Sequence, residues 1–128
     1  MVKVPVDDNV IDKYFSAKSE WKSGKRSDMV FITRQQSLPA IIVEIQNAVN
    51  NSFVLKLNEY CLNANDEYGR KPVSIVFSIK NTTKTILKES PIQTSTFFAR
   101  TLLSFPWTEE CILLDAYTTK EHINLWIC

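Results

Sequence analysis

Residues 40–46 have the sequence AIIVEIQ, an apolar run with a carboxylate near its end. A carboxylate in such a run is costly to bury unless a positive charge or a hydrogen-bond donor meets it. A second apolar run, Met29–Ile32, follows directly after Asp28. Two such runs joined by the polar residues 34–39 predict a hairpin that brings Asp28 close to Glu44.

The predicted hairpin fixes how close the two carboxylates lie. If the turn is centred near Gln36, opposed residue numbers sum to about 72, which places Asp28 opposite Glu44 or within one residue of it. Directly opposed side chains have Cβ atoms ~5 Å apart. At that distance one carboxylate is protonated unless a cation lies between them. Mg²⁺ or Mn²⁺ suits such a pair, because magnesium takes oxygen ligands and keeps several waters.

A structural interpretation of the two acids stays open beside the metal site. Asp28 could begin its strand as a turn residue, and Glu44 could pair with Lys56 or another basic group. Two features favour a site. Glu44 interrupts a strand that should be buried on both faces, and Gln46 adds a second polar group to the same face because side chains alternate along a strand.

The rest of the chain predicts an α/β domain with a mixed four-stranded sheet flanked by helices, in the order α-β-β-α-β-α-β-α. A first helix is expected from Asp8, fading between Trp21 and Gly24. Residues 82–93 are expected to form a loop. The other predicted helices are 50–68, 94–104 and one from Thr118, and the predicted strands are 28–33, 40–46, 73–80 and 111–117.

Composition limits the classes of function. The 128 residues fit one domain, and 45% hydrophobic content can build a core. Only two glycines occur, with no GxGxxG or Walker pattern, which excludes those routes to nucleotide binding. Three widely spaced cysteines and one histidine make a zinc site improbable. No apolar run approaches the ~18 residues of a membrane span, so a soluble intracellular domain, cytoplasmic or nuclear, is expected.

At the hairpin the chain resembles the PD-(D/E)XK nuclease superfamily. In that family an acid on one strand is followed by (D/E)-x-K on the antiparallel partner, then by a helix and another strand. Asp28 matches the first acid, Glu44 matches the second, and Gln46 stands in place of the lysine. The E-x-Q variant is similar to transposase-associated branches. The resemblance covers roughly residues 20–80 and implies a restriction-endonuclease-like core in a single domain over 1–128.

The resemblance implies metal-dependent hydrolysis of DNA phosphodiester bonds. Asp28 and Glu44 would hold Mg²⁺ (or Mn²⁺) together with the backbone carbonyl of Ile45. Glu20, near the end of the first predicted helix, would contact the metal through water. These roles are expectations carried over from the family.

Further roles follow from the same resemblance. Gln46 would orient the attacking water, since an amide can hydrogen-bond but cannot supply the charge of a lysine. Lys56 on the following helix would supply that charge, and Tyr60 shares its face. Three basic residues before Asp28 would contact the phosphate backbone, namely Lys22, Lys25 and Arg26. A solvated loop that makes no phosphate contact is an equal alternative.

A second hypothesis is a nuclease-like fold without catalysis that binds nucleic acid or protein. The net charge of only +1 and the aromatic residues Trp107 and Trp126 favour it. The apolar C-terminus WIC fits packing on another subunit, a chain cut from something longer, or a helix folded on its own sheet. For the nuclease hypothesis, duplex cleavage by one site per chain usually needs two chains, so a homodimer is one expectation.

Overall fold

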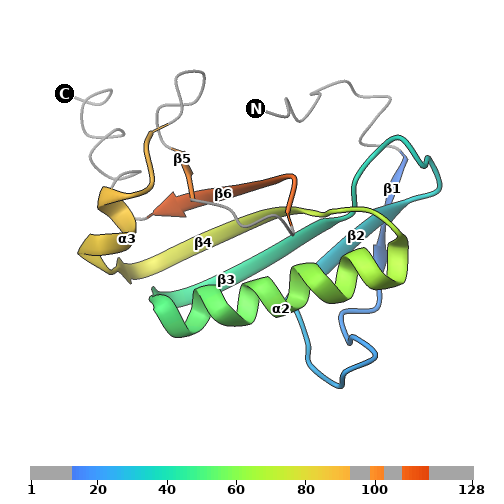
Figure 1. The fold of residues 1–128 in the computed structure, drawn as a ribbon, viewed down its shortest axis with the longest axis horizontal. Helices are drawn as coiled ribbons and strands as arrows, with labels where there is room; N and C mark the ends of the chain where they lie inside the picture. The colour runs from blue at the N-terminus through green and yellow to red at the C-terminus, as the bar shows by residue number, and fades with distance from the viewer. Residues whose placement is uncertain (1–12, 93–98, 103–107, 116–128) are drawn as a thin grey trace.

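The computed structural model describes residues 13–92, 99–102 and 108–115. Within them, six strands form one mixed sheet, accompanied by one long and one short helix (Figure 1). The elements are β1 (Tyr14–Ala17), β2 (Met29–Thr33), β3 (Ile41–Val49), α2 (Asn51–Tyr68), β4 (Val73–Thr82), α3 (Lys84–Lys88), β5 (Arg100–Thr101) and β6 (Glu110–Asp115). The α/β class and the mixed sheet are confirmed, whereas the predicted count of four strands is wrong.

The sheet has the strand order β1-β2-β3-β4-β6-β5. Strands β1, β2 and β3 are antiparallel, β3, β4 and β6 are parallel, and β5 returns antiparallel to β6. In the β2–β3 hairpin, Met29 opposes Val43 and Val30 opposes Ile42. These opposed numbers sum to 72, so the predicted register is confirmed.

Helix α2 covers one face of the sheet. The Asn50 side chain accepts a hydrogen bond from the Phe53 N–H at 2.9 Å, and Gly69 ends the helix in the left-handed conformation at φ 71°. The Cys61 sulfur lies 3.2 Å from the Ser74 hydroxyl of β4. The side chains of α2 that are buried against the sheet recur at helical spacing: Phe53, Leu57, Cys61 and Ala64.

Three predicted elements differ from the structure. Residues 14–17 form β1 rather than part of a first helix, because they pair with β2 and the Tyr14 hydroxyl donates to the Pro39 carbonyl at 2.7 Å. Adjacent aromatic residues suit such a strand. The predicted loop 82–93 contains α3, and residues 100–101 of the predicted helix 94–104 form β5.

Several expectations lie outside the described residues, namely the start of the first helix, the terminal helix from Thr118, and the two tryptophans Trp107 and Trp126. Among the described cysteines, Cys61 and Cys111 are buried free thiols, as core residues would be. The described part of the chain contains no helix long and apolar enough to cross a membrane.

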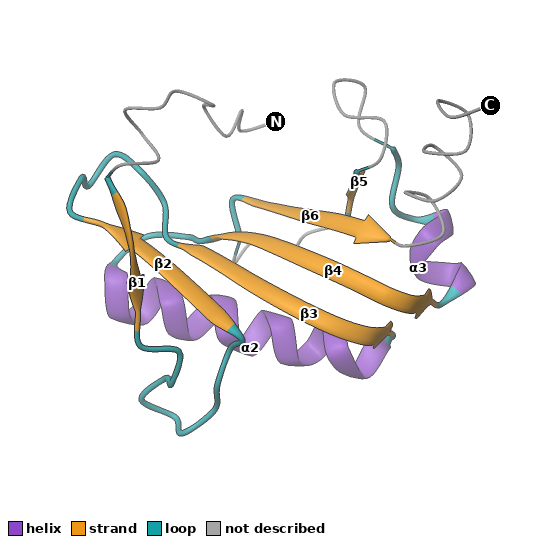
Figure 2. Cartoon of the chain, turned by 180° about the vertical axis from the view of Figure 1, so that it is seen from behind, coloured by secondary structure: helices purple, strands orange, loops and turns teal. Residues whose placement is uncertain are grey.

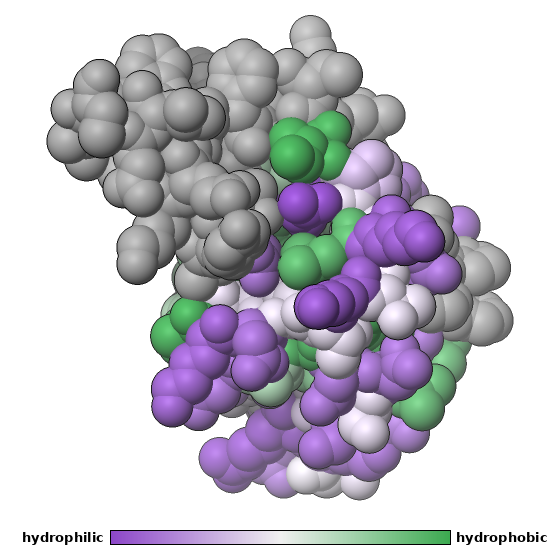
Figure 3. All heavy atoms as spheres, turned by 90° about the vertical axis from the view of Figure 1, so that its left-hand side faces the viewer, coloured by the Kyte–Doolittle hydropathy of each residue, from purple (hydrophilic) through white to green (hydrophobic). Residues whose placement is uncertain are grey.

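The sheet face opposite α2 carries exposed apolar side chains. Met29, Ile45, Phe77 and Ile79 are 38%, 45%, 39% and 52% exposed, and Ile45 is paired in register with Phe77. Figure 2 looks onto this face, and no described helix lies in front of it. By contrast, Figure 3 shows the end of the molecule near α3, where the described surface is mostly hydrophilic.

Candidate metal and phosphate site

The two carboxylates of the predicted site, Asp28 and Glu44, lie together at the start of β2. Asp28 directly precedes β2, and its N–H donates to Glu44 Oε2 at 3.2 Å. In return, Asp28 Oδ2 accepts the Ile45 N–H at 2.7 Å. The carboxylate of Asp28 therefore takes the place of a backbone acceptor just beyond the end of the β2–β3 ladder.

Glu44 is a buried carboxylate with an unsatisfied oxygen. Its side chain faces α2 and is 2% exposed, and Oε1 has no hydrogen-bond partner among the described residues. Burial, reinforced by the neighbouring Asp28 carboxyl, raises the pKa of Glu44 to about 8. The two ion pairs in the described part of the chain do not involve Glu44, so the alternative pairing with Lys56 is not formed.

The arrangement fits a divalent cation bound by oxygen atoms. The unpartnered Oε1 of Glu44 offers one ligand, and the exposed Asp28 carboxylate offers another. The N–H and C=O of one strand residue point to the same neighbour, so the Ile45 carbonyl also points to the side of Asp28. Across the described ranges no three His, Cys, Asp or Glu side chains gather, so water would complete the coordination.

Glu20 does not join this pair. It is exposed, forms a β-bridge with Arg26, and lies 3.4 Å from the Arg26 guanidinium. Its carboxylate is therefore engaged at the base of the loop rather than gathered with Asp28 and Glu44.

Gln46 lies two residues beyond Glu44 on the same strand and is half-buried. Alternation gives the two side chains the same face, and Gln46 is paired in register with Ser78 of β4. A register shift follows directly, between Gln46 and Ala48. Gln46 is thus placed where its amide can hydrogen-bond near Glu44 without adding charge.

Helix α2 contributes a second group of side chains. Lys56 is exposed, and Tyr60, one turn later, is half-buried. The pKa of Tyr60 is raised, first by burial and then by the Glu44 carboxylate, with Lys25 acting in the opposite direction. The Tyr60 hydroxyl therefore lies within electrostatic range of both the acidic site and the loop before β2.

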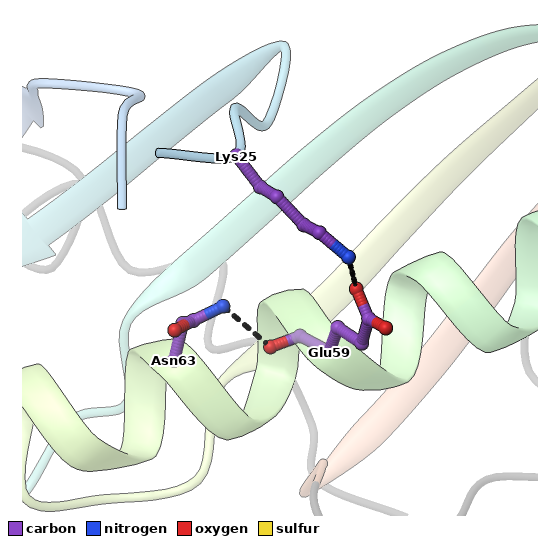
Figure 4. Close-up of polar contacts among 3 residues, drawn as sticks. All are labelled: Lys25, Glu59 and Asn63. Atoms are coloured by element: carbon purple, nitrogen blue, oxygen red, sulfur yellow. Dashed lines mark hydrogen bonds and ion pairs between the residues drawn. The ribbon is translucent and has the colours of Figure 1, made fainter. Parts of the chain in front are cut away.

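The basic residues of that loop differ in their surroundings. Lys22, Lys25 and Arg26 are all exposed. Lys25 forms an ion pair with Glu59 of α2, and the Asn63 side chain donates to the Glu59 carbonyl (Figure 4). Glu59 was missed in the sequence, where it looks like an ordinary solvated helix residue.

Trp21 was also missed as a structural anchor of the loop. It is 2% exposed, and its Nε1 donates to the Ser27 hydroxyl at 2.9 Å. Its ring meets Tyr68 of α2 edge-on at 6.3 Å between centroids. The loop before Asp28 is thus fixed to the helix, and a tryptophan inside a charged stretch was the signal for it.

No protein-family model matches this chain, and no curated protein or solved structure matches it either.

Proposed function

We propose that this protein is a metal-dependent nuclease with a restriction-endonuclease-like core of the PD-(D/E)XK type, acting on DNA phosphodiester bonds. The observation that carries this proposal is Glu44: a buried carboxylate beside Asp28 with one oxygen that the described residues leave unpartnered. Burying such a group without a partner is costly. A bound cation would offset that cost, which is why we interpret the pair as a ligand set.

Each residue has a role that its position supports. Asp28, Glu44 and the carbonyl of Ile45 would hold Mg²⁺ or Mn²⁺. Such a cation, when bound, polarises a phosphoryl oxygen and makes water a better nucleophile. Gln46 would orient the attacking water through its amide, and Asp28, the exposed member of the pair, would face the incoming phosphate. The basic loop side chains would contact neighbouring phosphates without selecting a base sequence.

The test is nicking of supercoiled plasmid with Mg²⁺ or Mn²⁺, comparing the wild type with Asp28→Ala. Asp28 is exposed but accepts the Ile45 N–H, so circular dichroism checks that the variant keeps the fold. The proposal expects metal-dependent nicking that Asp28→Ala loses. Nicking of equal rate in both proteins would trace the activity to a contaminant and would refute this site.

A second candidate function is supported by a separate observation, the apolar sheet face formed by Met29, Ile45, Phe77 and Ile79. At on the order of 200 Å² for a large apolar side chain, the exposed fractions of these four residues correspond to roughly 350 Å² per chain. Two such faces would bury roughly 700 Å², less than the ~1,000 Å² of a stable interface, which corresponds to a weak, transient dimer. An uncharged patch of this kind can pair with itself, so we propose an assembly module whose partner is a second copy of this chain.

Sedimentation equilibrium tests this second candidate. Phe77→Lys should convert a dimer to a monomer by placing like charges face to face. Leu55→Lys is the matched control, because Leu55 is 65% exposed on α2 and away from this face. A monomeric wild type at every concentration would exclude the homodimer.

A further inference from the structure

The candidate nuclease site lacks a cation from its own strand. Gln46 is neutral, whereas the charge that develops on a phosphate during cleavage is best stabilised by a positioned positive group. Two lysines come from elements beside the site: Lys56 on α2 and Lys25 on the loop before β2. The structure distinguishes between them.

The loop that carries Lys25 is tightly held. The backbone N–H of Trp21 donates to the Lys25 carbonyl at 2.8 Å, and the backbone N–H of Ser27 donates to the Ser19 carbonyl at 2.9 Å. Gly24, at φ 86°, takes the left-handed conformation that this turn requires. Lys25 therefore lies three residues before Asp28 on a backbone that these hydrogen bonds hold in place.

Lys25 also reaches across to α2. Its ammonium pairs with Glu59, the residue directly before Tyr60 (Figure 4). The positive charge of Lys25 lowers the pKa of Tyr60, which burial and the Glu44 and Asp28 carboxyls raise. Lys56 is exposed and makes no ion pair among the described residues. These observations place the charge of Lys25 beside Glu59 on α2, the helix that the Glu44 side chain faces.

We propose that Lys25 is the catalytic cation of this site, held at rest by Glu59 and transferred to the scissile phosphate when DNA binds. The inference rests on the proposed nuclease function. Both partners of the resting pair are about half exposed, at 50% and 49%. Such a pair contributes little stability, so its exchange for a phosphate contact costs little. Lys25 thereby supplies the charge that the glutamine at position 46 lacks.

The experiment compares Lys25→Gln with two matched losses of charge, Lys56→Gln and Lys18→Gln. Lys18 is exposed and precedes the same loop. Single-turnover cleavage in Mn²⁺ gives the rate, and the thermal shift by Mn²⁺ gives metal binding. We expect Lys25→Gln to slow cleavage about 100-fold with an unchanged Mn²⁺ shift. Lys25→Arg should recover most of the cleavage rate. The rates of Lys56→Gln and Lys18→Gln should stay within about threefold of the wild-type rate.

Glu59→Gln tests the resting partner. Freeing Lys25 should strengthen binding of a fluorescent duplex in Ca²⁺ by at most about fivefold at low salt, because the lost pair is exposed. The gain should vanish in the double variant with Lys25→Gln. A gain that persists without Lys25 would show only the removal of a negative charge and would refute the transfer.

Two outcomes overturn the role of Lys25: cleavage by Lys25→Gln within threefold of the wild type, or a larger loss in Lys56→Gln. If the wild type does not cleave, the proposed nuclease function fails, and the Ca²⁺ binding comparison still decides the phosphate contact. There Lys25→Gln should weaken duplex binding more than Lys18→Gln does. Equal losses would refute the contact.

Discussion

Two of the buried carboxylates among the described residues, Asp115 and Glu44, have opposite surroundings. Asp115, at the end of β6, is 1% exposed, and its Oδ1 accepts the Thr82 hydroxyl at 2.8 Å. Thr82 in turn lies 2.8 Å from the Ser78 hydroxyl. Glu44, in the middle of β3, is 2% exposed, yet one of its oxygens has no partner among the described residues.

The difference separates a structural acid from a candidate ligand. The Thr82 hydroxyl donates to Asp115 in place of water that burial removes, so that carboxylate belongs to the packing of the parallel strands. Glu44 lacks such a set of donors, and burial beside a second carboxylate raises its pKa to about 8. Unsatisfied acids of this kind concentrate at functional sites.

The largest expected effect is on cleavage. Glu44→Gln should lower the rate of metal-dependent nicking by about 1,000-fold or more, because the amide cannot replace a charged metal ligand. Asp115→Asn is the matched control, a buried acid turned into its amide away from the site. The nicking rate of Asp115→Asn, per folded molecule, should lie within a few-fold of the wild-type rate. An equal loss of nicking rate in both variants would show that the two acids do not differ in function.

The second expected effect is on the free energy of unfolding, to which Asp115 should contribute more than Glu44. Asp115→Ala should lower the free energy of unfolding by about 2 kcal/mol, because it removes the buried hydrogen bond that the Thr82 hydroxyl donates to a charged acceptor. Urea unfolding at pH 8 measures this. Glu44→Gln should unfold at the same or higher urea, since it removes a buried charge. A Glu44→Gln protein weakened as much as Asp115→Ala would make Glu44 structural.

The third effect is a pH dependence. Glu44 keeps its proton in the folded state at pH values where the unfolded chain has lost it, because its pKa rises from 4.5 to about 8. The free energy of unfolding should therefore fall as the pH rises through this window, by about 2 kcal/mol between pH 5 and 7 without metal. Glu44→Gln should flatten this slope. An unchanged slope in that variant would assign the dependence to other groups.

The smallest effect concerns the loop that positions Asp28. Trp21→Phe removes the hydrogen bond to the Ser27 hydroxyl and should cost about 1 kcal/mol of stability. The expected loss of nicking is severalfold, since the loop and the metal ligands remain. Thermal unfolding and plasmid nicking, measured on the same preparation, check both numbers. Unchanged stability would mean that the buried Trp21 does not anchor the loop.

Local patterns predicted the part of the fold that holds the site. The two apolar runs and the polar turn between them determined the β2–β3 register, and Asn50 with Gly69 bounded α2. The strand at Tyr14–Ala17 escaped prediction because its stability comes from pairing with β2, a contact distant in sequence. Residues 84–88 are too short for a periodic signal, so the sequence predicts a loop where α3 lies.

The candidate site was predictable only in part. Asp28 and Glu44 stood out because a charge inside an apolar run is unusual, and the hairpin brought them together. The pairing of Lys25 with Glu59 depends on how the loop lies against α2, which no local pattern carries. Glu20 was predicted near the metal because it seemed to end a helix, whereas it faces Arg26 in the loop.

Calorimetric titration of the wild type with Mn²⁺ at pH 8 measures directly whether the Asp28–Glu44 pair binds a cation. We expect saturable uptake of about one ion per chain, lost in Asp28→Ala and in Glu44→Gln and kept in Asp115→Asn. Folded wild-type protein that takes up no Mn²⁺, or uptake unchanged in Asp28→Ala, would contradict the assignment of this carboxylate pair as a cation site.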